Sequence, residues 1–188
     1  MKQTSSNYYP IMILTNYFIK REIQKLIQKA SERPHQYRSL NDIKNVLIIC
    51  DSKDWNIMRS CIEKLKAMNK TVNTTIFATS PKDVPTWYSN YLLIRADKDV
   101  NIWGFPDSAI QRQFYHLPAD LLIDFSSIHA CSLHYMFLKH PSTFKAGIKH
   151  SEDVIYDFSI IPPEDSNDLK FLFDQLISYL NTIQSKNG

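Results

Sequence analysis

Glycine is scarce in this sequence: the 188 residues include only Gly104, Gly147 and the terminal Gly188. Average proteins contain roughly 7% glycine. Phosphate-binding loops of the G-x-G-x-x-G and Walker A types need closely spaced glycines, because the backbone there adopts positive φ angles and approaches the ligand closely. The sequence therefore excludes both loop types. It also lacks the G-x-S-x-G motif that positions the nucleophile of many hydrolases.

Cysteine is also rare, and the three residues Cys50, Cys61 and Cys131 cannot all pair. They lie in apolar stretches, as expected of free, buried thiols in a reducing compartment. We therefore expect a cytoplasmic protein. Long apolar runs are missing as well, since the stretch from Tyr8 to Ile19 is interrupted by polar residues and is too short to cross a bilayer. We expect no transmembrane segment and no secretory signal.

Charge is unevenly distributed along the chain. Residues 1–45 contain eight Lys or Arg and three acidic residues, whereas residues 46–188 contain fourteen and sixteen. The nearly neutral body argues against a broad nucleic-acid surface. Residues 17–30 have the spacing of an amphipathic helix with four basic residues outside its apolar stripe, namely Lys20, Arg21, Lys25 and Lys29. In the simpler interpretation this helix docks on the sheet with a solvated basic face, and in the functional one it contacts a protein partner or a membrane surface.

Short apolar runs alternate with helical patterns through the rest of the chain. Strands are predicted at residues 45–50, 72–77, 91–94, 121–125, 143–148 and 154–158, and helices at 54–68, 108–116, 128–139 and 167–183. Such βαβ steps indicate a parallel sheet that is buried on both faces. We predict an α/β fold, a single three-layer Rossmann-like domain at residues 42–188 with a mainly parallel sheet of five to six strands and helices on both faces. Residues 1–41 are predicted to form a basic N-terminal helix and a linker.

Two carboxylates follow the most apolar of these runs, Asp51 after the first strand and Asp124 after the fourth. If these strands are neighbours, as in the order 3-2-1-4-5, both carboxylates face one crevice at the carboxyl edge of the sheet, where ligands bind to open α/β sheets. There they could hold a metal, orient a sugar hydroxyl or act as a base. The simpler interpretation is that Asp51, and Ser126 or Ser127, cap the following helices. Three serines complete the candidate crevice in the functional interpretation. Those serines are Ser52, Ser126 and Ser127.

Trp103 and Phe105 occupy a predicted loop at residues 97–106. They could form a lid over a ligand or a plug over the end of the core. No cofactor is expected. No metal site is expected either, because on a helix His129 would point away from Cys131 and His134 and the three could not share one ion. Cys131, Tyr135 and Leu138 are instead predicted to face the sheet.

The layout resembles an uncharacterised family of small bacterial α/β proteins of unknown function. The resemblance covers about Tyr17 to Ile183. It rests on the basic helix, the strand Val46 to Cys50 running into Asp51, the Trp103-Gly104 loop, and Ala119 to Ser126 followed by Lys145-Ala146-Gly147.

A more distant likeness links Asp120 to Asp124, with Ala146-Gly147-Ile148, to the N-terminal half of heptosyltransferase-type glycosyltransferases. Those enzymes bind the sugar nucleotide with a second Rossmann-like domain, so this chain would correspond to the acceptor half alone. The likeness implies fold more than activity. The leading hypothesis is a non-enzymatic cytoplasmic protein that binds a partner through its basic helix. The alternative is a degenerate or partner-completed glycosyltransferase-like or nucleotide-binding domain that uses the strand-end crevice.

Overall fold

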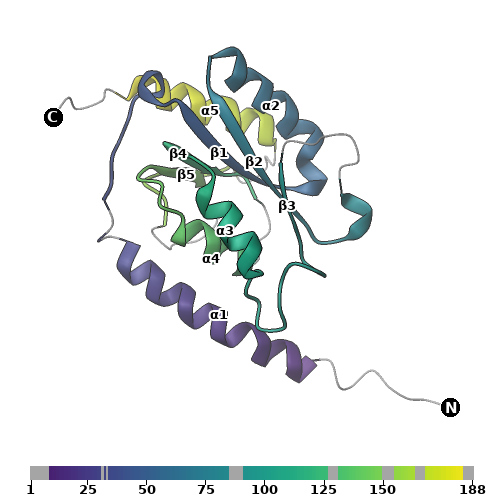
Figure 1. Cartoon of the computed structure of the whole chain (residues 1–188). Helices are drawn as coiled ribbons and strands as arrows, with labels where there is room; N and C mark the ends of the chain where they lie inside the picture. Colours follow the sequence, from purple (N-terminus) through teal and green to yellow (C-terminus); the bar gives the residue numbers. More distant parts are fainter. Residues whose placement is uncertain are drawn as a thin grey trace.

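The computed structural model describes residues 9–30, 32, 34–84, 91–126, 131–149, 155–163 and 168–183. Its centre is one six-stranded sheet in which every neighbouring pair of strands is parallel, in the order β3-β2-β1-β4-β5-β6 (Figure 1). The strands are β1 (Asn45–Asp51), β2 (Thr71–Ala78), β3 (Leu92–Arg95), β4 (Leu121–Asp124), β5 (Lys145–Ile148) and β6 (Phe158–Ile160). The predicted α/β fold with a parallel sheet is confirmed.

Helices cover both faces of this sheet. The helices α2 (Trp55–Ala67) and α5 (Leu169–Thr182) cover one face, and α3 (Ser108–His116) and α4 (Cys131–Lys139) cover the other (Figure 1). Three short 3₁₀ helices occur in the connections: η1 (Leu40–Asp42), η2 (Ser52–Asp54) and η3 (Pro81–Asp83). The described part of the chain thus has a three-layer arrangement, with one hydrophobic cluster on each face of the sheet.

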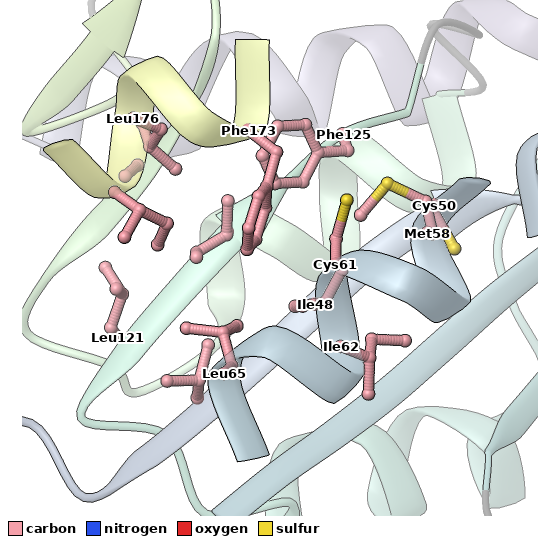
Figure 2. Close-up of a cluster of buried hydrophobic side chains, with 14 of the residues drawn as sticks. Ile48, Cys50, Met58, Cys61, Ile62, Leu65, Leu121, Phe125, Phe173 and Leu176 are labelled. Carbon is pink, nitrogen blue, oxygen red and sulfur yellow. The ribbon is translucent and has the colours of Figure 1, made fainter. Parts of the chain in front are cut away.

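Alternation along the strands divides the core between these two clusters. Ile48 and Cys50 of β1 point toward α2 and α5, where Phe125 and Phe173 also meet (Figure 2). Leu47 and Ile49 point toward α3 and α4. Because successive side chains of a strand alternate between faces, Asp51 belongs to the same face as Ile49.

The N-terminal helix α1 (Tyr9–Ala30) lies outside α4 and packs chiefly on it (Figure 1). Ile19, Ile23 and Ala30 are buried, so the apolar stripe predicted from the sequence is the docked face of the helix. The helix starts at Tyr9, well before the predicted start at Tyr17, because a proline is tolerated in the first turn, where its missing N–H has no helical partner. The helix covers α4 and not the sheet itself.

Side-chain contacts tie residues 34–39, which follow α1, to the body of the protein. The His35 ring contacts the Asp157 carboxylate, and the Tyr37 and Phe144 rings meet edge to face at 5.8 Å. The Arg38 guanidinium lies 3.5 Å from the Asp120 carboxylate. These contacts hold the C-terminal end of α1 in place.

Two details of the predicted fold were wrong. The sixth strand spans Phe158–Ile160 and not 154–158. Just before it, the Asp157 backbone N–H donates to the Lys145 carbonyl, and the Lys145 backbone N–H donates to the Asp157 carboxylate. In α4 the most buried apolar side chains are Leu133, Met136 and Phe137, which the predicted stripe did not contain. Of the predicted residues, Tyr135 and Leu138 do pack against this face of the sheet but are only half-buried, as is Cys131. Because α4 lies between the sheet and α1, apolar residues occur on two of its faces.

Candidate functional site

The structure places Asp51 and Asp124 at one edge of the sheet, on adjacent strands. Since β1 and β4 are parallel and Ile49 is in register with Asp124, Asp51 lies two residues beyond it toward the same carboxyl edge. Strand alternation assigns both side chains to the α3 and α4 face. The strand order also reverses between β1 and β4, which is the position where open α/β sheets bind ligands. The strands that end in Asp51 and Asp124 are therefore neighbours, as the crevice hypothesis requires.

Asp124 is held by hydrogen bonds within the protein. Its Oδ1 accepts bonds from the backbone N–H of Ser126 at 2.9 Å and from the Ser126 hydroxyl at 2.7 Å, and its Oδ2 accepts a bond from the Tyr156 hydroxyl at 3.0 Å. Burial, followed by the charge of Asp124, raises the pKa of Tyr156, so this hydroxyl remains a neutral donor. The Asp124 carboxylate therefore shapes the turn after β4.

Gly147 makes the contact between Tyr156 and Asp124 possible. A Cβ atom at this position would lie 2.6 Å from the Tyr156 ring and 2.8 Å from the Asp124 carbonyl oxygen. Real Cβ atoms do not approach other heavy atoms so closely, and the backbone oxygen cannot easily move aside. The absence of a side chain on β5 thus lets an aromatic ring pack over the end of β4.

Asp51 is almost completely buried, with 1% of its surface exposed. Its carboxylate forms no capping bond to η2, so the predicted capping role is not observed. Burial raises the pKa of the adjacent Cys50 thiol, and the negative charges of Asp51, Asp54 and Asp124 raise it further. A thiol held protonated in this way is a poor nucleophile. Ser52 and Ser126 are buried as well, and Ser127 lies outside the described residues.

Trp103 and Phe105, predicted to cover this crevice, contact helices on the outside of the molecule. The Trp103 ring meets the Phe18 ring of α1 edge to face at 5.2 Å. The Phe105 ring meets the Tyr135 ring of α4 in the same manner at 5.3 Å. Their loop follows β3 and reaches α1 near the N-terminal half of that helix (Figure 1). The two aromatics thus join α1 and α4 to the loop.

This loop is held in shape by Asn101. The Asn101 side-chain oxygen accepts bonds from the backbone N–H groups of Trp103 at 2.9 Å and Phe105 at 3.1 Å. The Asn101 backbone also bonds to Phe105 and Gly104, and Gly104 has a φ of 84°, which suits a residue without a side chain. With its backbone satisfied internally, the loop presents Ile102 with 72% and Trp103 with 43% of the side chain exposed.

The four predicted basic residues of α1, Lys20, Arg21, Lys25 and Lys29, are all exposed. Lys25 forms an ion pair of 2.6 Å with Glu22, the only acid in residues 17–30. That hydrogen bond, assisted by the charges of Lys25, Arg21 and Lys139, lowers the pKa of Glu22. The surface around Glu22 is therefore positively charged.

A hollow of about 380 Å³ lies between α1 and the loop, lined by Phe18, Arg21, Glu22, Trp103 and Phe105. We define the aromatic-basic patch as this hollow together with its exposed neighbours Tyr17, Lys25 and Ile102. The sequence pattern indicated Trp103, Phe105 and the basic residues as candidates but not Phe18. The signal was available, because Phe18 falls outside the stripe formed by Ile19 and Ile23.

Other features of the described residues do not add a second site of this kind. A groove of about 540 Å³ at the amino edge is lined mainly by strand and helix ends, including Asn73 and His116. Within the described ranges, no three His, Cys, Asp or Glu side chains converge as metal ligands would. No helix in this part of the chain has the length and apolar character to cross a membrane.

Comparison with known proteins agrees with the resemblance noted for the basic helix, the strand ending at Asp51 and the later loop. Curated proteins gave no match to this sequence. A family model described as "Family of unknown function (DUF6913)" matches residues 15–183, which include most of α1, the whole sheet and the closing helix α5. Because the match covers most of the 188 residues, the chain belongs to this family of unknown function.

Proposed function

We propose that this protein is a non-enzymatic cytoplasmic binding protein that contacts its partner through the aromatic-basic patch. The observation that carries this proposal is the pairing of Phe18 with Trp103 on the outside of the molecule. Two large aromatic side chains from separate elements meet there and remain about half exposed, beside the still more exposed Ile102. Contiguous exposed apolar surface with a polar rim is typical of interaction sites.

The chemistry at the carboxyl edge supports a binding function over catalysis. Asp124 is occupied by Ser126 and Tyr156, and Asp51 is withdrawn from solvent. A general base must reach the proton that it removes, and a nucleophilic thiol must ionise. The Asp124 carboxylate is already hydrogen-bonded within the protein, and the raised pKa of Cys50 keeps its thiol protonated. Neither group meets the condition for its catalytic role.

Point substitutions test the proposal better than removal of α1, because Ile19 and Ile23 are buried and a deletion would uncover α4. We expect the double variant Phe18→Ser with Trp103→Ser to lose most of the partner-bound fraction when lysate is separated by size and density. The matched control is Ile161→Ser with Phe171→Ser, which removes two exposed apolar residues elsewhere. Equal bound fractions in the two double variants would refute the proposal.

The alternative is a degenerate or partner-completed glycosyltransferase-like or nucleotide-binding domain. The specific observation in its favour is that Asp51 and Asp124 lie at the point where the strand order reverses. If this alternative holds, a sugar nucleotide raises the melting temperature and Asp51→Asn removes the increase. A melting temperature that stays constant at millimolar sugar nucleotide counts against it.

A further inference from the structure

The aromatic-basic patch combines two kinds of side chain that occur together where proteins rest on membranes. Trp103 and Tyr17 are of the types enriched at the boundary between lipid and water, where an apolar ring with a polar atom is favoured. Ile102 is an aliphatic residue at the turn of a rigid loop, with 72% of its surface exposed. An aliphatic side chain in this position gains most from contact with hydrocarbon.

The charge that α1 contributes beside these residues has one dominant sign. Residues 17–30 contain four basic residues and a single acid, Glu22, which is already paired with Lys25. Lys139 of α4 adds a further positive charge close enough to influence Glu22. The exposed charges thus complement an anionic surface, and basic residues near such a surface strengthen binding.

The sequence of α1 continues this character beyond the patch. Residues 9–16, the first two turns of the helix, contain four aliphatic or methionine residues and no charged residue. Figure 1 shows that this end of α1 extends past the loop that carries Trp103. The basic stretch of α1 is therefore preceded by a stretch that adds no charge to oppose it.

We infer that the aromatic-basic patch docks the protein on the surface of an anionic lipid bilayer, with Ile102 and Trp103 entering the boundary and the basic residues of α1 contacting the headgroups. This inference rests on the proposed function, since it names the partner of the same surface. A protein partner of acidic character is the competing occupant. The exposed Ile102 beside a basic helix favours lipid, because an anionic bilayer offers hydrocarbon and negatively charged headgroups side by side.

The test is flotation of the purified full-length protein with phosphatidylcholine vesicles, prepared with and without phosphatidylglycerol. We expect binding to the anionic vesicles that weakens as salt is added, because salt screens the charges. The variant Ile102→Ser with Trp103→Ser should bind roughly tenfold more weakly, as should Arg21→Gln with Lys25→Gln. The fluorescence of the protein should shift to shorter wavelength on binding, and Trp103→Ser should remove that shift.

Two controls match these variants. Ile161→Ser removes an isoleucine that is also 72% exposed, and Lys64→Gln with Lys66→Gln removes two exposed charges from α2. Both should bind as the unmodified protein does. No flotation with anionic vesicles at millimolar lipid, or equal losses in patch and control variants, would overturn the inference. If the Phe18 and Trp103 variant still loses its bound fraction in lysate, the proposed function survives with a protein as the partner.

Discussion

The carboxyl edge of the sheet and the aromatic-basic patch use their side chains in opposite ways. At the edge, polar groups are buried and bind to each other, as Asp124 does with Ser126 and Tyr156. At the patch, the loop backbone is satisfied by Asn101 while Ile102 and Trp103 remain exposed. The difference shows that the Asp124 carboxylate at the edge is committed to contacts within the fold, whereas the apolar side chains of the patch are open to a second surface. Substitutions should therefore affect stability at the edge and binding at the patch.

The largest effect is expected at Asp124. The variant Asp124→Ala removes the acceptor of three hydrogen bonds and leaves the Tyr156 hydroxyl unpaired, so it should lower the free energy of unfolding by about 3 kcal/mol. Tyr156→Phe should cost only about 1 kcal/mol, because Asp124 keeps its bonds to Ser126. Urea denaturation measures both values. A loss below that of the exposed control Asp174→Ala would show that this carboxylate is not needed for the fold.

A comparable effect should appear on acidification, through His140. Burial, and then the charge of Lys145, lowers the pKa of His140 from 6.5 to about 4 in the folded protein. Its ring contacts the Leu117 carbonyl through Nε2 and accepts the Ser142 N–H through Nδ1, an arrangement that requires neutral imidazole. The unfolded state takes up a proton below pH 6.5, so stability is fully present above that pH and falls by roughly 3 kcal/mol toward pH 4.

Denaturation curves at several pH values, compared between the unmodified protein and His140→Gln, measure this effect. Glutamine does not titrate, so the variant should show a shallower loss between pH 6.5 and 4. Parallel pH profiles would mean that His140 contributes nothing to the acid sensitivity. His140 directly follows the C-terminal end of α4 and is buried. The comparison therefore tests whether a buried polar group away from the carboxyl edge also contributes to stability.

A smaller loss, about 2 kcal/mol, is expected for Gly147→Ala. The added methyl group would overlap the Tyr156 ring and the Asp124 carbonyl oxygen, and the ring must shift away from Asp124 to make room. Combining the variant with Tyr156→Phe should give less than the sum of the separate losses, because both weaken the same contact. If the losses of the two single variants simply add in the double variant, the strain caused by the alanine does not lie at the Tyr156 contact. Thermal or urea unfolding of the two single variants and the double variant is sufficient.

The smallest change in stability is expected at the patch. Ile102→Ser with Trp103→Ser should alter the free energy of unfolding by less than about 0.5 kcal/mol, because exposed side chains contribute little to folding. The same variant should bind its partner much more weakly. Urea denaturation of this variant beside the Ile161→Ser control tests the point. A loss as large as that of Asp124→Ala would mean that these residues belong to the core and remove the contrast between the two regions.

The sequence was sufficient to predict the parallel sheet, and the expected adjacency of the strands that end in Asp51 and Asp124 is present. Continuous apolar runs such as Val46 to Ile49 report burial on both faces, and a βαβ order constrains which edge their ends share. These features depend on local pattern, which a single sequence contains.

Features that depend on a third element could not be predicted in the same way. Tyr135 was placed toward the sheet because helical periodicity identifies an apolar face but not which neighbour covers it. The same holds for Trp103, whose partner Phe18 lies 85 positions earlier in the sequence and on a separate helix. The hydrogen bond between Tyr156 and Asp124 also escaped detection, since Tyr156 lies 32 positions later in the sequence, in the segment just before β6.

The side chain of Asn101 affects how tightly the aromatic-basic patch can bind a second surface. A loop whose backbone is already fixed by internal hydrogen bonds has little conformational freedom left to lose on contact with a second surface. Ile102 and Trp103 are therefore presented in one arrangement before any encounter, and the strength of attachment depends on what they touch and hardly at all on the cost of ordering them.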